Sequence, residues 1–352
     1  MNLREFSRAV GLSPTTVSRA LGGYPEVSEA TRALVRDAAR EMGYRPDRRA
    51  ASLATGRAMA IGHVLPRARG YEMVNPVFAD FVAGAGEIYA ERGYDMIVSF
   101  VGGDDELRAY RQMVSARSVD GVIVHGPRDD DPRPALLRAA GLPFVVHGRV
   151  PGVPEDYPYV DVANTRAFAH ATAHLTGLGH RRIALVNGHE HLDFARRRRE
   201  GWARALRNAG LEPDPALARA GAMSEQNGHA FAAELLARER PTAFVVSSLI
   251  MAVGVRRAVQ AAGLTVGRDV SIVTHDDELG FLGNGGGDGA PLFTATRSSV
   301  RAAGRRCAEV LIARIGAPDA LPVQEVWDAE LVGGASSGPP PSPTGAPPGD
   351  MR

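Results

Sequence analysis

The feature that most constrains this chain is a long alternation of strand-like and helix-like segments between residues 58 and 332. Helical patterns such as Pro76–Arg92 and Phe194–Ala209 lie between short apolar runs. These runs are Ala60–Leu65, Asp95–Val101, Val119–His125, Pro143–His147, Arg182–Asn187, Thr242–Ser247 and Val270–His275. Alternating strands and helices form parallel sheets that helices cover on both faces. A segment of about 275 residues favours two such lobes rather than one.

Two α/β lobes place the expected binding site in the cleft between them, because sites in open parallel sheets form at the carboxyl ends of the strands. Phe78 lies at a helix start, where its ring can stack on a sugar or a base. Arg149 follows the run that ends at His147 and offers a forked donor, and Asn164 opens the next helix. Each residue is equally compatible with a purely structural role.

Composition excludes several kinds of chemistry. The single cysteine, Cys307, rules out an internal disulfide and a multi-cysteine metal site. All 41 basic side chains are arginines, which excludes a Walker lysine, a pyridoxal-phosphate Schiff base and a lysine nucleophile. His170 and His174 have a metal-binding spacing but no third ligand, and Gly283–Gly289 lacks the spacing of a nucleotide-binding loop. We therefore expect no cofactor, no metal and no enzymatic activity.

Charge is distributed unevenly along the chain. Residues 1–57 hold ten arginines and six acids, a net charge of +4, whereas the whole chain carries +1. A basic front module on a mildly acidic body indicates a nucleic-acid partner for that module alone. The chain start has no apolar signal core, and no apolar run approaches the ~20 residues of a membrane span. We expect a cytoplasmic protein with no membrane partner.

The front module is predicted to contain three short helices. The first stops at Gly11. The second begins after Ser13, a hydroxyl cap, with Pro14 at its first position, where the missing N–H of proline costs nothing. The third runs from Ser28 to Gly43. Two helices joined by so short a glycine-containing turn are typical of a helix-turn-helix.

The second of these helices has two distinct faces. At 100° per residue, Val17, Ala20 and Leu21 fall on one side and can pack on the other two helices. The opposite side carries Thr15, Ser18 and Arg19, flanked by Pro14 and Thr16. Hydroxyls and arginine bind base edges and phosphates, and one arginine can bridge guanine O6 and N7. The alternative is a solvated three-helix domain that binds nothing.

A short amphipathic segment follows this module. Asp47 can cap a helix that Gly56 ends, with Arg48 and Arg49 near its start and Leu53 one turn later. A helix this short is marginal in water, so we expect it to fold only against a partner copy and DNA. Leucine inserted between base steps kinks a duplex through the minor groove. The alternative is a linker whose leucine docks on the body.

Four stretches of the front of the chain carry a specific resemblance. They are Leu12–Leu21, Val27–Arg32, Gly43–Pro46 and Ala50–Leu53. In order and spacing they resemble the lactose-repressor (LacI/GalR) family of transcriptional regulators. The resemblance implies that the second helix reads the major groove, and that the hinge helix enters the minor groove in the dimer. Gly22 and Asp47 stand where the family has asparagine, and the charge of Asp47 near phosphates can weaken or retune operator binding.

The same resemblance assigns roles to residues of the DNA-binding module. It puts Pro14 and Thr15 at the variable base-reading positions. It puts Thr16, Ser18 and Arg19 at the fixed positions and makes Leu53 the minor-groove lever.

Further stretches extend the resemblance to the type I periplasmic-binding-protein fold. They are Asn75–Phe78, Val119–Gly121, Leu178–Ala184, Arg198–Trp202, and Asp269–Val273 followed by Asp276 and Asp277. The resemblance implies that Arg198 and Asp276 contact the inducer, since such a pair can chelate vicinal hydroxyls. Two departures are visible. Ala163 replaces the aspartate usual before Asn164, and Ser248 lies where the family has an asparagine–aspartate pair. We therefore expect the pocket to have its own hydrogen-bond pattern.

The resemblance also implies that two copies act together. The helix start Pro76–Phe81 lies where the family's lobes pair, and two reading heads on a two-fold axis recognise a near-palindrome. The expected partners are therefore double-stranded operator DNA, a small-molecule effector and a second copy of the chain. Gly333–Arg352 contains six prolines and five glycines and is predicted to be a disordered tail. The sequence leaves dimer and tetramer open.

The predicted fold is an N-terminal all-α helix-turn-helix with a hinge helix, followed by a two-lobed α/β domain of the type I periplasmic-binding-protein kind. The predicted boundaries are 1–57 for the DNA-binding module (hinge helix at about 47–56), 58–332 for the ligand-binding and dimerisation body, and 333–352 for the tail.

The predicted function is a ligand-responsive, sequence-specific repressor of a carbohydrate operon, released from its operator by a small-molecule inducer. The segment Tyr24–Val27, with proline after the capping serine, is similar to α-glucoside-operon repressors of the family. It therefore favours a sugar, an α-glucoside, over a purine. The alternatives are a solute-binding protein of a sugar transporter and a regulator that responds to a purine or another co-repressor.

Overall fold

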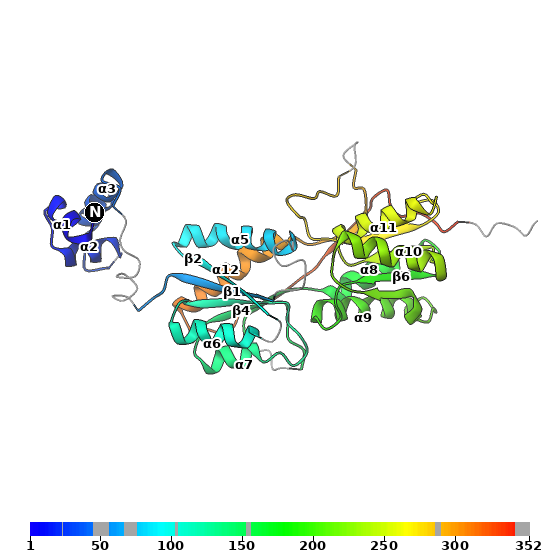
Figure 1. The fold of residues 1–352 in the computed structure, drawn as a ribbon, viewed down its shortest axis with the longest axis horizontal. Helices are drawn as coiled ribbons and strands as arrows, with labels where there is room; N and C mark the ends of the chain where they lie inside the picture. The colour runs from blue at the N-terminus through cyan, green and yellow to red at the C-terminus, as the bar shows by residue number, and fades with distance from the viewer. Residues whose placement is uncertain are drawn as a thin grey trace, which may run out of the picture.

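The structure, a computed structural model, describes residues 1–22, 24–44, 56–66, 76–102, 105–152, 156–285 and 290–341. Figure 1 shows a small helical module at the N-terminus and a body of two lobes. Residues 45–55 lie outside the described ranges, and with them the predicted hinge residues Arg48, Arg49 and Leu53.

The N-terminal module forms three helices, as its sequence predicts. They are α1 (Leu3–Val10), α2 (Pro14–Leu21) and α3 (Glu29–Glu41). Gly11 ends α1 in the left-handed conformation with φ 72°, and the hydroxyl of Ser13 caps α2 by accepting the N–H of Thr16 at 3.0 Å. A small apolar core holds the helices together, and in it the ring of Phe6 stacks on Tyr44 at 4.2 Å between centroids.

Each lobe is built on a six-stranded sheet. The first sheet contains β1 (Ala60–Pro66), β2 (Asp95–Val101), β3 (Gly121–His125), β4 (Phe144–His147), β5 (Tyr159–Val162) and β11 (Gln324–Trp327). The second contains β6 (Ile183–Asn187), β7 (Ala218–Ala220), β8 (Ala243–Val246), β9 (Ser271–Asp276), β10 (Thr294–Arg297) and β12 (Glu330–Val332). The strand orders are β11-β5-β4-β3-β1-β2 and β12-β10-β9-β8-β6-β7. All neighbouring pairs are parallel except β10 and β12. The predicted two-lobed parallel architecture is confirmed.

Helices cover both faces of the first sheet, as Figure 1 shows for α5 and α12 on one face and α6 and α7 on the other. These helices are α5 (Pro76–Arg92), α6 (Glu106–Ala116), α7 (Arg133–Ala139) and α12 (Val300–Gly316). The second lobe contains α8 (Asn164–Gly177), α9 (Asp193–Asn208), α10 (Glu225–Arg238), α11 (Leu249–Ala261) and a short 3-10 helix, Pro215–Leu217.

The chain crosses between the lobes three times. It passes from β5 of the first sheet to α8 of the second lobe, from β10 back to α12, and from β11 to β12. Neither lobe is therefore a continuous piece of sequence, and the three crossings join the two lobes.

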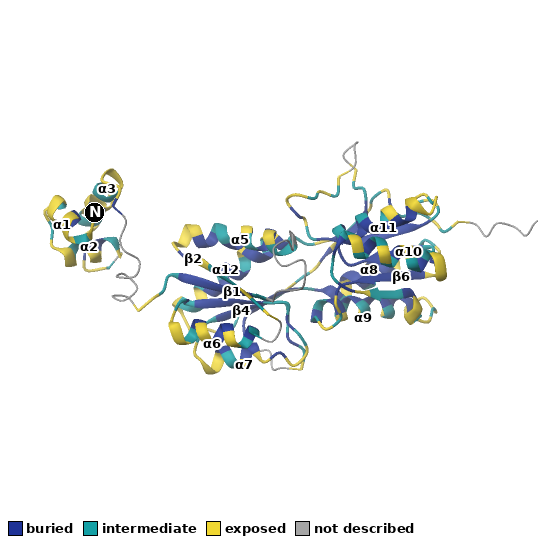
Figure 2. Cartoon of the chain, viewed as in Figure 1, coloured by how far each residue is buried: buried dark blue, intermediate teal, exposed yellow. Residues whose placement is uncertain are grey.

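The central strands are buried on both faces. Along β3, Val122 and Val124 point into one apolar cluster and Ile123 into the other. This double burial explains why the strands read as continuous apolar runs, and Figure 2 shows it as buried strands between half-exposed helices. Among the described residues, none of the helices combines the length and the apolar character needed to cross a bilayer.

The predicted disordered tail from Gly333 is wrong for its first residues. Ser336 is 2% exposed, the N–H of Ile272 donates to its carbonyl at 2.8 Å, and its hydroxyl accepts the N–H of Thr294 at 2.9 Å. Residues 333–341 therefore pack on the second sheet. Small residues allow this close approach, and the composition that suggested disorder serves packing instead. Residues 342–352 lie outside the described ranges.

Glycines let the helices of a pair approach each other closely. A Cβ added to Gly84 of α5 would overlap the carbonyl oxygen of Arg301 in α12, and one added to Gly304 of α12 would overlap the carbonyl oxygen of Phe81. Gly86, also in α5, has no atom within 4 Å of such a Cβ.

These two glycines of α5 make a matched test of the helix contact. Gly84→Ala is expected to lower the free energy of unfolding by about 1–3 kcal/mol, because a backbone carbonyl must move to admit the methyl group. Gly86→Ala is expected to raise it by up to about 1 kcal/mol through helix propensity. Urea denaturation of the two variants measures both values, and equal effects would contradict the close-approach argument.

Candidate functional site

The outward face of α2 carries the predicted DNA-reading residues. Pro14, Thr15, Ser18 and Arg19 are exposed, whereas Thr16 is partly buried. The Thr16 hydroxyl lies 2.8 Å from that of Ser13. Four of the five side chains thus project from the module, while Val17 and Ala20 lie in its core.

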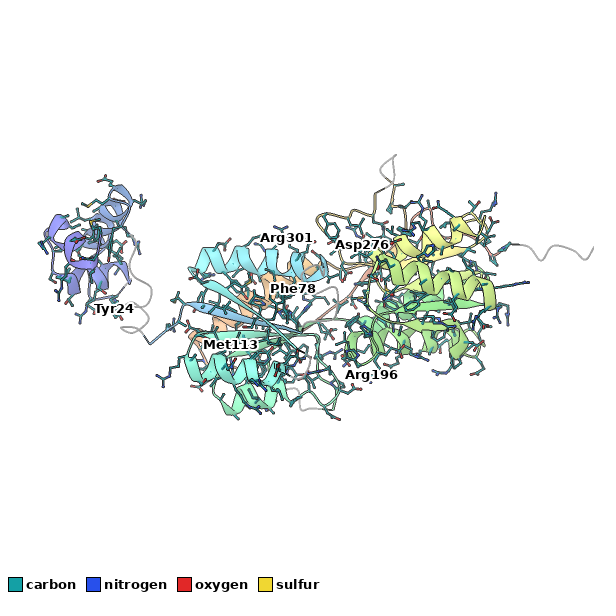
Figure 3. All side chains as sticks on the ribbon, in the orientation of Figure 1. Tyr24, Phe78, Met113, Arg196, Asp276 and Arg301 are labelled. Atoms are coloured by element: carbon teal, nitrogen blue, oxygen red, sulfur yellow. The ribbon has the colours of Figure 1, made fainter. Side chains whose placement is uncertain are left out.

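One neighbour of this face was not anticipated from the sequence. The guanidinium of Arg19 lies 3.6 Å from the carboxylate of Glu26, and both side chains are about half exposed. Such a pair is weak in water and can open when a phosphate or base competes for the arginine. Tyr24, labelled in Figure 3, lies in the same turn after α2.

A buried guanidinium is the centre of the second candidate site. Arg198 of α9 is 6% exposed, and its Nε donates to the Oδ1 of Asn164 at 2.8 Å. Its Nη1 donates to the carbonyl of Ser247 at 2.5 Å. The rings of Phe168 and Phe194 lie 5.0 and 4.9 Å from its Cζ, which places the guanidinium between two aromatic rings.

Two carboxylates, one from each lobe, act electrostatically on this buried charge. Burial lowers the pKa of Arg198 to about 10, while Asp277 and Asp161 act in the opposite direction. Burial also raises the pKa of Asp277 to about 6, against the effect of Arg198. Asp161 in β5 accepts a hydrogen bond from the Nε of Arg149 at 2.8 Å. Burial raises the pKa of Asp161, and Arg149 opposes that shift.

A hollow of about 430 Å³ adjoins this cluster and has walls from both lobes. Arg149 and Val326 of the first lobe face the start of α8 and one side of α9 across it. Its lining is Arg149, Ala163, Asn164, Thr165, Arg166, Arg197, Glu200, Arg204 and Val326. Three predicted site residues, Arg149, Asn164 and Arg198, thus belong to one connected polar region.

Two further hydrogen bonds join the lobes. The N–H of Asp193 donates to the carbonyl of Pro127 at 3.0 Å, and the N–H of Gly280 donates to the carboxylate of Asp80 at 2.9 Å. Figure 3 shows Phe78, Asp276 and Arg196 in the region where the lobes meet.

Phe78 contacts a group of histidines at the first lobe's side of the cleft. Its ring lies 6.3 Å from that of His63 and 5.2 Å from that of His125. The Nδ1 of His63 lies 3.0 Å from the Nε2 of His125, and His147 follows on the next strand. Burial lowers the pKa of His63 and of His147 to about 4. At neutral pH this wall is therefore aromatic and uncharged.

The remaining two predicted ligand residues do not line the hollow beside Asn164. Ser248 is 1% exposed and caps α11 by accepting the N–H of Met251 at 3.3 Å. Asp276 lines a different hollow of about 320 Å³, together with Glu278, Leu279, Leu282, Gly283, Asn284, Pro291 and Arg297. The carboxylate that acts on Arg198 is the adjacent Asp277. Neighbouring positions at the end of a strand point in different directions, so the sequence match did not separate the two aspartates.

His174 of the histidine pair and the single cysteine, which were set aside in the sequence as metal or disulfide candidates, have partners or neighbours inside the protein. The Nε2 of His174 lies 3.0 Å from the hydroxyl of Ser337, and Cys307 is fully buried in α12. Within the described ranges, no three histidine, cysteine or acidic side chains are grouped so that they could hold a metal ion.

The raised pKa of Asp277 predicts a pH-dependent cost. A carboxyl whose folded-state pKa lies above its unfolded value contributes stability below about pH 4, and loses it as the pH rises through about 6. The free energy of unfolding of Asp277→Asn, relative to that of wild type, should therefore rise by about 2–3 kcal/mol from pH 4 to pH 7. Denaturant titrations across this range measure the difference between the two free energies of unfolding. A difference that does not change with pH would contradict it.

Comparison with known proteins agrees with both parts of the chain. Residues 2–47 match the family described as "Bacterial regulatory proteins, lacI family", and residues 172–337 match "Periplasmic binding protein-like domain". HTH-type transcriptional regulator AglR of Rhizobium meliloti (strain 1021) is 46% identical over 97% of this chain and 95% of its own. HTH-type transcriptional regulator CelR of Thermobifida fusca is 32% identical over 94% and 96%.

Solved structures agree as well. A transcriptional regulator CelR–cellobiose complex is 31% identical with a TM-score of 0.70, and covers 96% of this chain and 99% of its own. The lac repressor dimer bound to operator and the anti-inducer ONPF is 25% identical with a TM-score of 0.79 over the same shares. The resemblance predicted from the sequence is confirmed: this chain belongs to the lacI family of bacterial regulatory proteins, which are transcriptional regulators.

Proposed function

We propose that this regulator is a sugar-responsive repressor that binds a near-palindromic operator as a homodimer and releases it when a neutral sugar enters the cleft. The observation that carries the proposal is the buried guanidinium of Arg198, which donates hydrogen bonds to Asn164 and to the carbonyl of Ser247 beside the hollow between the lobes. The carboxylates of Asp161 in one lobe and Asp277 in the other favour its charged form. A ligand with vicinal hydroxyls can accept hydrogen bonds from such a guanidinium and donate to such carboxylates.

The character of the cleft supports a neutral ligand. The histidines beside Phe78 are uncharged at neutral pH, and Arg149 is already paired with Asp161. An aromatic ring next to hydrogen-bonding groups suits a sugar, which has apolar C–H faces and a rim of hydroxyls. The relative solved with cellobiose supports the same ligand class. Within that class we favour an α-glucoside, on the similarity of Tyr24–Val27 to that branch of the family.

The proposed mechanism is thermodynamic linkage. Each copy supplies one α2 to the major groove, with Pro14, Thr15, Thr16, Ser18 and Arg19 reading the half-site. Leu53 acts in the minor groove, and Arg48 and Arg49 of the same segment also contact the DNA. A sugar that prefers one arrangement of the lobes shifts the pair of reading heads out of register, so sugar and operator oppose each other by the same coupling free energy.

The reading face is tested with two arginines of the DNA-binding module that are both exposed and each lie near one acidic side chain. Arg19 pairs with Glu26, and Arg40 of α3 pairs with Asp37 at 3.0 Å. Arg19→Ala should weaken binding to the duplex that wild type selects from a random pool by about 10-fold or more, since a base-reading arginine is worth about 1–3 kcal/mol. The affinity of Arg40→Ala for the same duplex should stay within about two-fold of the wild-type value. Fluorescence anisotropy at rising salt measures both, and wild-type affinity should fall steeply as salt rises.

No binding of wild type to any duplex at low salt would contradict the proposal and favour a solute-binding role. Equal losses in the two arginine variants would place the reading face elsewhere.

The effector site is tested with neighbouring arginines of α9. Arg199 pairs with Glu190 at 2.9 Å and is partly exposed, unlike Arg198. Wild type is first screened by thermal shift against mono- and disaccharides, beginning with maltose and trehalose. Arg198→Met should lower the affinity for the responding sugar by about 100-fold, because the substitution removes charge-assisted hydrogen bonds while it keeps most of the side-chain volume. Arg199→Met should change the affinity for the same sugar by less than about two-fold. A full response of the Arg198 variant would remove this site from consideration.

A further inference from the structure

The junction between the DNA-binding module and the body is held by one carboxylate. Asp120 lies just before β3, 61 residues after Met59 in the chain. Its Oδ1 accepts the N–H of Ala58 at 2.6 Å, and its Oδ2 accepts the N–H of Met59 at 2.9 Å. Both oxygens of one side chain thus bind consecutive amides at the point where the chain enters the first lobe.

The backbone that these bonds hold is strained. Met59 has φ 50°, in the left-handed region that side chains with a Cβ rarely adopt. Such a conformation persists where surrounding contacts impose it. Besides the two bonds to Asp120, the carbonyl of Met59 accepts the N–H of Asp95 at 2.8 Å. Three hydrogen bonds therefore hold the backbone of Ala58 and Met59 at the edge of the first lobe.

The carboxylate itself is anchored in the rigid part of the first lobe. The N–H of Asp120 donates to the carbonyl of Ala60 at 2.8 Å, and its neighbour Val119 is 5% exposed. On its other side, a Cβ added to Gly121 would lie 2.9 Å from Leu311 of α12. Asp120 therefore has little freedom to follow the linker if the linker moves.

The strand that starts here ends at the cleft. β3 runs from Gly121 to His125, and the ring of His125 lies 5.2 Å from that of Phe78. One short strand, each residue of which pairs with β1 or β4, thus connects the carboxylate that holds the linker with the aromatic wall of the proposed effector site.

We propose that Asp120 is a positioning residue for operator recognition: by holding the amides of Ala58 and Met59 it fixes the direction in which the DNA-binding module leaves the first lobe. The inference rests on the proposed function, because it concerns how two reading heads are kept at the spacing of the operator half-sites. A head on a freely pivoting linker still touches phosphates but meets its half-site at a lower effective concentration.

The test compares full-length wild type, Asp120→Ala, Asp120→Asn and the control Asp214→Ala. Asp214 also accepts a backbone N–H, from Ala216 at 2.9 Å, but in the second lobe. Anisotropy gives the affinity of each for the duplex that wild type selects and for a scrambled duplex of the same length. The affinity of Asp120→Ala should fall by about 10-fold for the selected duplex and by less than two-fold for the scrambled one. Asp120→Asn, which keeps one acceptor oxygen, should lose about three-fold, and the control should match wild type.

Hydrogen exchange supplies a readout that needs no DNA. The amides of Ala58 and Met59 should exchange at least 10-fold faster in Asp120→Ala than in wild type or Asp214→Ala. Unchanged exchange, unchanged selectivity, or equal losses for both duplexes would overturn the inference. If wild type does not distinguish the two duplexes, the proposed function fails instead, and exchange at the two amides still reports whether the clamp exists.

Discussion

The burial of one guanidinium constrains the whole region between the lobes. Arg198 is 6% exposed, and a charge removed from water is costly unless it is paired and hydrogen-bonded. Its hydrogen bonds go to Asn164 and to the carbonyl of Ser247. The carboxylates of Asp161 in a first-lobe strand and of Asp277 beyond a second-lobe strand favour its charged form. A displacement of one lobe relative to the other therefore changes the energy of that charge. A ligand that binds the guanidinium can then favour one arrangement over another, as effector control requires.

Much of the fold was predictable because its strongest signals are local. Serine caps, a proline at the first helical position and a left-handed glycine define the front helices, and each is visible in the sequence. The central strands are buried on both faces and read as apolar runs. Five strands were not indicated by the sequence: β5, β7, β10, β11 and β12. They have three or four residues each and mix polar with apolar side chains. Their pairing depends on contacts with strands distant in the chain.

The candidate site was predictable in part for the same reason. Arg149 follows β4, Asn164 begins α8 and Arg198 lies in the second turn of α9, so topology brings them together. Asp161 escaped notice because its strand did, and the influence of Asp277 on Arg198 escaped notice because a sequence match cannot say which way adjacent side chains point. Ser248 was found from the sequence as a polar residue, but the sequence pattern did not show that its hydroxyl caps α11. These outcomes depend on geometry that only the assembled lobes define.

The account treats reading heads and cleft as two ends of one linked system, and reciprocity tests that claim most directly. Calorimetry would measure the affinity of the most strongly stabilising sugar with and without the selected duplex, and anisotropy the affinity of the duplex with and without that sugar. We expect each ligand to weaken the other by the same factor, between about 5-fold and 150-fold. Two affinities that do not depend on each other would contradict the account.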